Sequence, residues 1–164
     1  MRIVILGCGR VGSTLASILT REGHQVSIID RDQEAFNKAS QRLGADFAQE
    51  TVQGVGIDED ILRQAGIEEA EAFIAVTSGD NTNIVAAQIA RDHFRVPKVL
   101  VRVYDPIRAE AYREAGLETI CTTSITAGLF HDLLLDRPLR TLREYLDTTP
   151  GRAGSPEHPG EPPS

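Results

Sequence analysis

The chain has 164 residues, a length that suits one domain with a well-buried core. Its net charge of −7 argues against general binding to nucleic acids or anionic membranes, because both require a basic protein surface. No apolar run approaches the roughly 20 residues of a membrane span, so we expect no direct insertion into a membrane.

The first residues and the cysteines favour a cytoplasmic protein. The chain begins with an apolar strand instead of the charged region of a signal peptide. Cys8 and Cys121 lack the spacing of a metal site or a redox pair, and we interpret both as reduced thiols.

Short β-rich runs alternate with helical stretches, a pattern typical of βαβ units around a parallel sheet. We expect strands at Arg2–Leu6, Gln25–Ile29, about Phe47–Gln53, Ala72–Val76, Val99–Val103 and Glu118–Cys121. Six strands with intervening helices predict an α/β fold, with a doubly wound Rossmann-type sheet of six parallel strands.

The first helix is expected over Arg10–Glu22, with Gly23 ending it. Four apolar residues predict its buried stripe: Val11, Leu15, Ile18 and Leu19. Three aspartates are expected to cap later helices. These helices run from Asp58 through Ala65, from Asp80 over Asn81–Phe94, and from Asp105 with Pro106 in its first turn to a point before Gly116.

The last long helix is expected from Ser124 onward, with Pro138 breaking it, and has a wider apolar surface than one packing stripe requires. That surface comprises Ile125, Leu129, Phe130, Leu133, Leu134 and Leu135. Composition leaves two interpretations open: packing on its own sheet, or a crossover or dimerisation helix. A short amphipathic segment follows at 136–147, and 148–164 is Pro/Gly-rich and expected to be disordered.

A glycine-rich turn, Gly7-x-Gly9-x-x-Gly12, joins the first strand to the first helix. In that context the motif is typical of dinucleotide binding. Gly7 permits the tight turn, Gly9 lets a pyrophosphate approach the backbone, and Gly12 lets the helix pack closely on the strand. The helix N-terminus also favours the anion through its free N–H groups and dipole.

Asp30 follows the second strand, where a carboxylate accepts hydrogen bonds from the adenosine ribose. It would repel a 2′-phosphate and so favours NAD or an adenine nucleotide over NADP. Arg31 weakens that discrimination, because it is positioned to pair with such a phosphate. A solvated strand end or a helix cap remains the alternative for Asp30.

Three further features suggest an anion site. Arg10 lies in the first turn of the helix, where a cation is unfavourable unless phosphates are present, although a solvated arginine is also plausible. Small hydroxyl and amide side chains gather after the fourth strand in the segment 77–83, either to bind ligand or only to cap the next helix. Arg102 lies within an apolar strand and requires a carboxylate or phosphate partner.

No Ser/His/Asp, Cys/His or paired-carboxylate constellation is recognisable in the sequence. A hydride-transferring enzyme needs a substrate pocket and an acid or base, yet only a helix and the tail follow Cys121. The chain is therefore expected to bind a nucleotide without being an enzyme.

Taken together, these segments resemble the N-terminal domain of TrkA/Ktr-type potassium-uptake regulators, the RCK proteins, from about Met1 to Leu135. The glycine turn is shared with many dehydrogenases. The resemblance becomes specific through Thr77-x-x-Asp80-x-x-Asn83 and Arg102-Val103-Tyr104-Asp105-Pro106. It implies an RCK N-terminal domain at 1–135, followed by the amphipathic segment and the tail.

The resemblance implies a cytoplasmic subunit at the inner face of the cell membrane that binds NAD(H) or, alternatively, ATP, ADP or AMP. Such a subunit dimerises or forms a higher ring and gates a potassium-translocating membrane protein. Gly7, Gly9 and Gly12 would hold the phosphates, Arg10 would reach the distal phosphates and Asp30 would bind the ribose. The full implied nucleotide-binding set is Gly7, Cys8, Gly9, Arg10, Val11, Gly12, Asp30, Arg31, Thr77, Ser78 and Arg102.

Two departures from the family pattern are present. Many relatives carry Gly-Asp-x-Thr/Ser-Asp after the third strand, whereas this chain has Gly54-Val55-Gly56-Ile57-Asp58, which leaves contacts to the adenine open. Many relatives also continue into a C-terminal ligand-sensing domain, for which this sequence has no counterpart after the crossover helix.

Three functions therefore stand at this point. The first is a non-catalytic regulatory subunit of a potassium transport system. The second is an NAD-dependent oxidoreductase domain or subunit, which rests on the same glycine turn and Asp30. The third is a redox or energy sensor that acts on a soluble partner.

Overall fold

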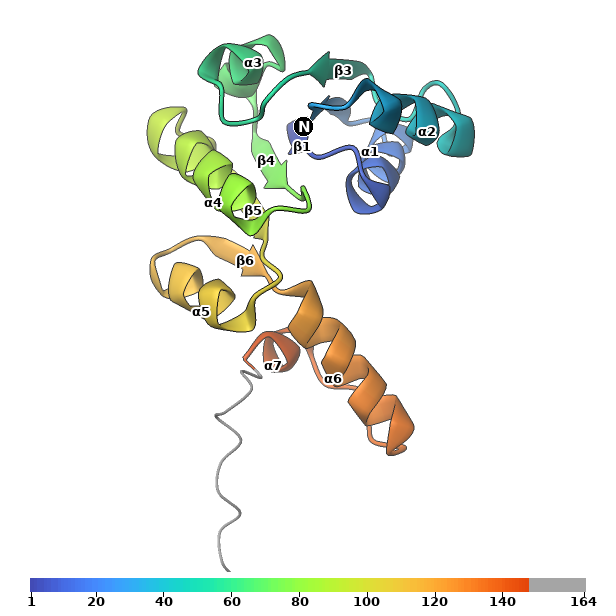
Figure 1. Cartoon of the computed structure of the whole chain (residues 1–164), viewed down its shortest axis with the longest axis vertical. Helices are drawn as coiled ribbons and strands as arrows, with labels where there is room; N and C mark the ends of the chain where they lie inside the picture. Colours follow the sequence, from blue (N-terminus) through green and yellow to red (C-terminus); the bar gives the residue numbers. More distant parts are fainter. Residues whose placement is uncertain (148–164) are drawn as a thin grey trace, which may run out of the picture.

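The computed structural model describes residues 1–147 (Figure 1). The expected disorder of 148–164 lies outside the described residues. The strands are β1 Arg2–Leu6, β2 Gln25–Asp30, β3 Glu50–Gln53, β4 Ala72–Ala75, β5 Lys98–Arg102 and β6 Glu118–Ile120. The α-helices are α1 Arg10–Arg21, α2 Gln33–Leu43, α3 Glu59–Gln64, α4 Asp80–Gln88, α5 Pro106–Glu114, α6 Thr122–Leu134 and α7 Leu142–Leu146.

The six strands form one parallel sheet in the order β3-β2-β1-β4-β5-β6. The predicted fold class is thereby confirmed. Leu6 pairs with Ile29 of β2 on one side of β1 and with Ala75 of β4 on the other. The strand order reverses at β1, so the chain leaves β1 and β4 in opposite directions and opens a crevice at their carboxyl ends.

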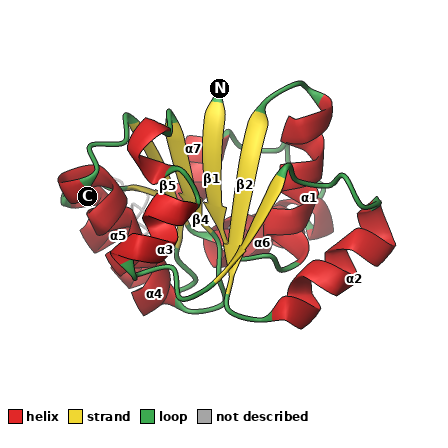
Figure 2. Ribbon diagram, turned by 90° about the horizontal axis from the view of Figure 1, so that it is seen from above, coloured by secondary structure: helices red, strands yellow, loops and turns green. Residues whose placement is uncertain are grey.

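Helices cover both faces of the sheet (Figure 2). On one face, α1 and α2 cover the sheet, and Phe36 of α2 clusters with Ile5 and Ile28 of the strands. On the other face, α3, α4 and α5 cover the sheet, and Leu62 of α3 clusters with Phe73 of β4. Because parallel strands buried on both faces must be apolar, β1 is a continuous hydrophobic run from Ile3 to Leu6.

Helix α1 buries its small residues and only half of the expected apolar stripe, Leu15 and Leu19, which pack against the core. Gly12, Ser13, Ala16 and Ser17 are buried, whereas Val11 and Ile18 are each 48% exposed. The prediction for Val11 and Ile18 was wrong, because the small side chains let the helix lie so close to the sheet that larger residues turn outward.

Most of the predicted helix ends are confirmed. Asp58 and Asp105 accept hydrogen bonds from backbone N–H groups of the helices that they precede. Gly23, Gly66 and Gly116 take positive φ values of 85°, 79° and 84° just after helices, where glycine is favoured.

The prediction that Asp80 caps the helix after the fourth strand was wrong. Asp80 is the first residue of α4 instead of its cap, and its carboxylate accepts the N–H groups of Tyr104 (2.9 Å) and Asp105 (3.2 Å). The expected helix over Asn81–Phe94 is α4 followed by a π-helical segment, Ile89–His93. Asp80 therefore ties the start of α4 to the segment after β5.

Between β2 and β4, one helix was not predicted from the sequence and the start of one strand was predicted too early. No sequence signal delimited α2, although Asp32 caps it by accepting the N–H of Glu34 at 3.0 Å. The third strand begins at Glu50 and not near Phe47, which is buried ahead of it in the core.

Helix α6 begins two residues earlier than expected, with Cys121 as its cap, and buries Ser124, Gly128 and Asp132. Its apolar side chains point largely to solvent, so the interpretation that it simply packs on its own sheet is wrong. The exposed apolar residues of α6 and the segment after it are Phe130, Leu133, Leu134, Leu135, Leu139 and Leu142. Figure 1 shows α6 extending away from the sheet.

A polar cluster joins α6 to α7. The Asp132 side chain is 4% exposed and accepts hydrogen bonds from the Arg140 guanidinium at 2.8 and 3.3 Å. Arg140 in turn lies over the Tyr145 ring, which packs against Gly128. Hydrogen bonds from Arg140 and then His131 lower the pKa of Asp132 from 3.8 to about 2.

No helix within residues 1–147 combines the length and the apolar character that crossing a bilayer requires.

Candidate functional site

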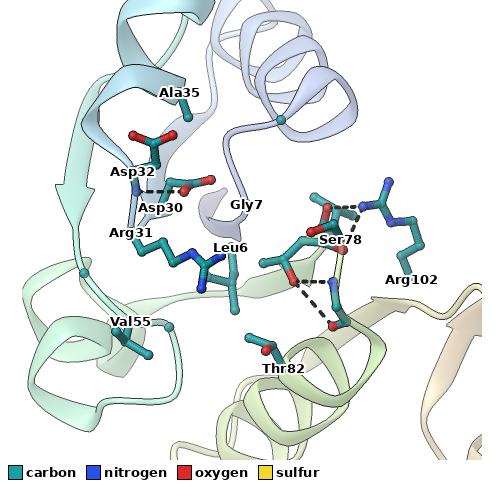
Figure 3. A pocket seen from close by; sticks show the side chains of 16 residues that line it. Leu6, Gly7, Asp30, Arg31, Asp32, Ala35, Val55, Ser78, Thr82 and Arg102 are labelled. Carbon is teal, nitrogen blue, oxygen red and sulfur yellow. Dashed lines mark hydrogen bonds between the residues drawn. The ribbon is translucent and has the colours of Figure 1, made fainter.

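A cavity of about 510 Å³ lies at the carboxyl ends of the central strands, in the crevice where β1 and β4 lie side by side (Figure 3). Its walls come from the ends of β1, β2, β3, β4 and β5 and the turns that follow them. The lining residues are Leu6, Gly7, Gly9, Asp30, Arg31, Asp32, Ala35, Gly54, Val55, Gly56, Val76, Thr77, Ser78, Gly79, Thr82 and Arg102.

The three glycines of the turn serve different purposes. Gly7 has φ +107°, and a Cβ there would lie 2.9 Å from the backbone nitrogen of Thr77. A Cβ on Gly12 would collide with the carbonyl oxygen of Gly7. By contrast, a Cβ on Gly9 would meet no atom within 4 Å. The fold therefore requires glycine at positions 7 and 12. At position 9 the fold would accept a Cβ, so only a ligand in the adjacent cavity would require glycine there.

Asp30 holds the glycine turn in place. One carboxylate oxygen accepts the N–H of Cys8 at 2.7 Å, and the other accepts the N–H of Asp32 at 3.0 Å. The Cys8 thiol is buried beneath the turn, and burial, together with the charge of Asp30, raises its pKa to about 12. Cys8 is thus an unreactive thiol at neutral pH.

Arg31 extends its guanidinium into the cavity toward Leu6 (Figure 3). Within residues 1–147, only its backbone carbonyl is hydrogen-bonded, to the side chain of Gln53 at 3.4 Å. The guanidinium therefore offers all its donors to a ligand.

Arg102 lies at the other end of the cavity, at the end of β5. Its guanidinium donates to the carbonyl oxygens of Val76 at 2.6 Å and Thr77 at 2.8 Å. Its buried Nε has no hydrogen-bond partner among the described residues. Of the two expected partners, a carboxylate is not found among the described residues: two neutral carbonyls hold this cation through Nη2. A phosphate partner stays a prediction.

Asn83 is buried in α4 and fixes the backbone between β4 and β5. Its side-chain oxygen accepts the N–H of Thr77 at 2.8 Å and the Thr77 hydroxyl at 2.7 Å. Its amide nitrogen donates to the carbonyls of Thr77 at 2.9 Å and Arg102 at 3.0 Å. The sequence analysis gave Asn83 no individual role.

Charge is divided across the cavity. The carboxylates of Asp30 and Asp32 lie at the β2 end, beside Ala35 of α2. Ser78, Thr82 and Arg102 supply hydroxyl groups and a cation at the β4 and β5 end. The arrangement suits a ligand with hydroxyl groups at one end and negative charge at the other.

The loop after β3 closes the cavity between these two ends. Val55 is 54% exposed, and a Cβ on Gly56 would collide with the Leu6 side chain, so the loop backbone lies directly against β1. The loop presents the exposed apolar side chains of Val55 and Ile57 together with its backbone.

The predicted site residues divide into two groups. Those that line the cavity are Gly7, Gly9, Asp30, Arg31, Thr77, Ser78 and Arg102. Cys8 and Gly12 are buried behind the turn, whereas Arg10 and Val11 are exposed on the first turn of α1, outside the lining. Within 1–147 no group of three or more His, Cys, Asp or Glu side chains is placed to hold a metal ion.

Several lining residues were missed. Asp32 and Ala35 carry no motif of their own, and proximity to a predicted strand end was the only available signal. Gly54, Gly79 and Thr82 lie in segments that the sequence singles out, 54–58 and 77–83, but were not assigned individually.

Comparison with protein families matches residues 3–123 to the TrkA-N domain. A Trk system potassium uptake protein TrkA from Streptomyces coelicolor is 54% identical over 146 residues, which cover 89% of this chain and 62% of that protein. A TrkA homologue from Methanothermobacter thermautotrophicus is 33% identical over 138 residues, covering 84% of this chain and 62% of the homologue. The chain thus spans about three fifths of the length of these relatives.

Solved structures share the fold. The Kef CTD of Shewanella denitrificans in an AMP-bound form has a TM-score of 0.64 at 19% identity, covering 88% of this chain and 86% of that one. The GsuK channel bound to NAD has a TM-score of 0.63 at 21% identity, covering 79% of this chain and 22% of that one.

Proposed function

The chain belongs to the TrkA-N domain family, and on that premise we propose that it is a nucleotide-binding regulatory subunit of a potassium transport system. The observation that carries the proposal is the cavity at the strand ends, with the open Gly9 at its centre and Asp30 and Arg102 at its two ends. Family membership supplies the biological context, and the cavity supplies the ligand chemistry.

The adenosine half of the ligand lies at the β2 end. Asp30 accepts hydrogen bonds from the ribose hydroxyls, and Asp32 adds negative charge that disfavours a 2′-phosphate. Arg31 lies over the same end with its donors free within the described residues and contacts the base or the first phosphate. The backbone of Val55 and Gly56 closes the adenine side.

The phosphates cross the glycine turn. At Gly9 they approach the start of α1 without meeting a side chain, and the helix N-terminus offers N–H groups and a favourable dipole. Beyond the turn, Thr77, Ser78 and Arg102 bind the distal half of the ligand. Arg10 reaches the distal phosphates from the first turn of α1 by a change of side-chain conformation.

The ligand is NAD or NADH, with ATP, ADP or AMP as the alternative. Two structures with the same fold contain AMP or NAD, respectively. A cavity of about 510 Å³ is within the range of ligand pockets of roughly 300–1,000 Å³ and does not separate a mononucleotide from a dinucleotide.

A regulatory role is favoured over catalysis. The related proteins are potassium uptake proteins of a non-enzymatic family. The two carboxylates of the cavity accept backbone N–H groups, Asp30 from Cys8 and Asp32 from Glu34, which favours a binding role over that of a free general base.

The subunit acts at the inner face of the cell membrane through its partner, a potassium-translocating membrane protein. The exposed apolar surface of α6, with Phe130 at 72% and Leu134 at 82% exposure, is covered by a second copy in a homodimer or higher ring. Ligand affinity that differs between two assembly states then shifts their populations and gates the partner.

Potassium uptake under limiting potassium tests the transport half. A strain that lacks the gene is expected to grow poorly, and the wild-type gene to restore growth fully. A Gly9→Ala gene is expected to restore growth less well if nucleotide binding drives regulation. Normal uptake without the gene would contradict the transport role. Mass analysis of the nucleotide that co-purifies with the protein identifies the physiological ligand.

A further inference from the structure

A second, more open cavity lies at the start of α6. Its lining residues are Tyr104, Thr122, Thr123, Thr126, Ala127 and Phe130. This α6 groove, as we call it, joins the exposed apolar surface of that helix at Phe130, which is 72% exposed. Its wall on the β5 side is the Tyr104 ring.

One side chain links the linings of the two cavities. The Arg102 guanidinium lines the nucleotide cavity, and its Cζ lies 4.6 Å from the centre of the Tyr104 ring. This distance is within the range of a cation–π contact. Tyr104 is 41% exposed, so its ring has space to move.

The Tyr104 backbone, in contrast, is fixed at both ends. Its N–H donates to Asp80 at 2.9 Å, and its carbonyl accepts the Cys121 thiol at 3.5 Å. Asp80 begins α4, and Cys121 caps α6. A change at Tyr104 is therefore confined to its side chain, which lines the α6 groove and contacts Arg102.

Arg102 is also incompletely satisfied where it stands. Its two acceptors, the carbonyls of Val76 and Thr77, are neutral, and its buried Nε has no partner within residues 1–147. A ligand phosphate would give charge-assisted hydrogen bonds, which are roughly twice as strong as those to neutral acceptors. An anion in the cavity therefore competes for the guanidinium against the Tyr104 ring.

We propose that Arg102 and Tyr104 form a coupling pair: an anionic ligand draws the Arg102 guanidinium into the nucleotide cavity, and the released Tyr104 ring reshapes the α6 groove. The inference rests on the proposed nucleotide binding and adds the route by which occupancy reaches the α6 surface. Coupling of this kind requires that the pair have a second arrangement, with Arg102 away from the Tyr104 ring, and that the ligand favour it.

Fluorine NMR on the full chain tests this route without altering the native contacts. The chain has three tyrosines, so incorporation of 3-fluorotyrosine gives three resonances, which single Tyr→Phe changes assign. Calorimetry with ADP and NAD measures binding in parallel. At saturation, the Tyr104 resonance is expected to shift, while those of Tyr112 and Tyr145 move much less.

Two arginine variants distinguish the proposed Arg102–Tyr104 coupling from a general effect of ligand binding. Arg31→Met removes a cation from the same cavity that contacts no tyrosine, so binding should weaken while the Tyr104 shift at saturation persists. Arg102→Met should move the Tyr104 resonance before any ligand is added and abolish its further shift at saturation. The wild-type and Arg31→Met titrations keep the test decisive even if Arg102→Met folds poorly.

Two results would overturn the coupling pair alone. One is ADP or NAD binding to the wild-type chain with an unmoved Tyr104 resonance, and the other is a Tyr104 shift that persists in Arg102→Met at saturation. Absence of calorimetric binding would instead overturn the proposed function, and the coupling with it.

Discussion

The side chain of Asn83 hydrogen-bonds to the N–H, the carbonyl and the hydroxyl of Thr77, and its fourth hydrogen bond reaches the carbonyl of Arg102. Asn83 is 0% exposed, so the amide is fully withdrawn from water. Through these contacts one buried side chain sets the positions of Thr77 and Arg102, which form the distal end of the nucleotide cavity.

Replacing Asn83 by alanine is expected to destabilise the fold. The change removes the acceptor of the Thr77 N–H and a donor to the Arg102 carbonyl, at a cost of about 1–3 kcal/mol in the free energy of unfolding. Urea unfolding followed by circular dichroism measures this loss. Asn81→Ala is the matched control, because Asn81 is exposed on the same helix and bonds through its side chain to Arg108. Equal losses in the two variants would contradict the role of Asn83.

The glycines of the turn are expected to differ in their effect on stability. Gly12→Ala forces a Cβ against the carbonyl oxygen of Gly7 and should cost about 1–3 kcal/mol or more. Gly9→Ala meets open space at φ −71°, so the unfolding free energy should change by no more than about 1 kcal/mol. Thermal or urea unfolding of both variants checks the contrast, and comparable destabilisation would refute it.

Asp30→Ala is expected to weaken both ligand binding and the fold. Loss of hydrogen bonds between the ribose and a charged group is worth about 1.5–3 kcal/mol, or roughly a 10- to 150-fold loss of affinity. The sequence alone suggests an effect on binding with little effect on folding. However, the carboxylate also accepts the N–H groups of Cys8 and Asp32, so unfolding should become easier too.

Calorimetry and urea unfolding of Asp30→Ala separate these two effects. Asp46→Ala is a suitable control, because Asp46 is exposed and lies outside the cavity. Unchanged affinity in Asp30→Ala would mean that this carboxylate does not contact the ligand.

Acid should weaken the contact between α6 and α7. Hydrogen bonds from Arg140 and His131 lower the pKa of Asp132 from 3.8 to about 2. A carboxyl whose pKa is lower in the folded state stabilises that state above its unfolded pKa, and the contribution disappears as pH falls through the folded pKa. Asp132→Asn should therefore destabilise the chain at pH 7, and its deficit against wild type should shrink between pH 3.8 and about 2.

Urea unfolding of wild type and Asp132→Asn across this pH range measures the difference. A deficit that is independent of pH would show that the charge of Asp132 is not what holds α7 on α6.

Local chemistry explains what the sequence predicts well. Parallel strands buried on both faces must be apolar, and aspartates such as Asp58 and Asp105 satisfy helix N–H groups from a fixed offset. The glycine turn and Asp30 form a recognisable motif, because backbone geometry and the expected ligand both restrict which residues fit at these positions. These features depend on few neighbours and are therefore readable from sequence.

Long-range packing explains what the sequence leaves out. Asp80 has the composition of a helix cap, yet Tyr104, 24 residues away, supplies the N–H that its carboxylate accepts. Val11 fits an apolar stripe, but the close approach of Gly12 to Gly7 turns it to solvent. The first outcome depends on which segment lies next to α4, and the second on the distance between α1 and the sheet. No local sequence pattern encodes either.

Calorimetric titration of the wild-type chain and Gly9→Ala with NAD, NADH, ATP, ADP and AMP tests nucleotide binding most directly. The wild-type chain is expected to bind at least one of them. Gly9→Ala should fold normally yet bind it at least about tenfold more weakly, a difference of about 1.4 kcal/mol, because its methyl group occupies the path of the phosphates. No binding by the wild-type chain, or equal affinity in the two proteins, would contradict a phosphate site at the glycine turn.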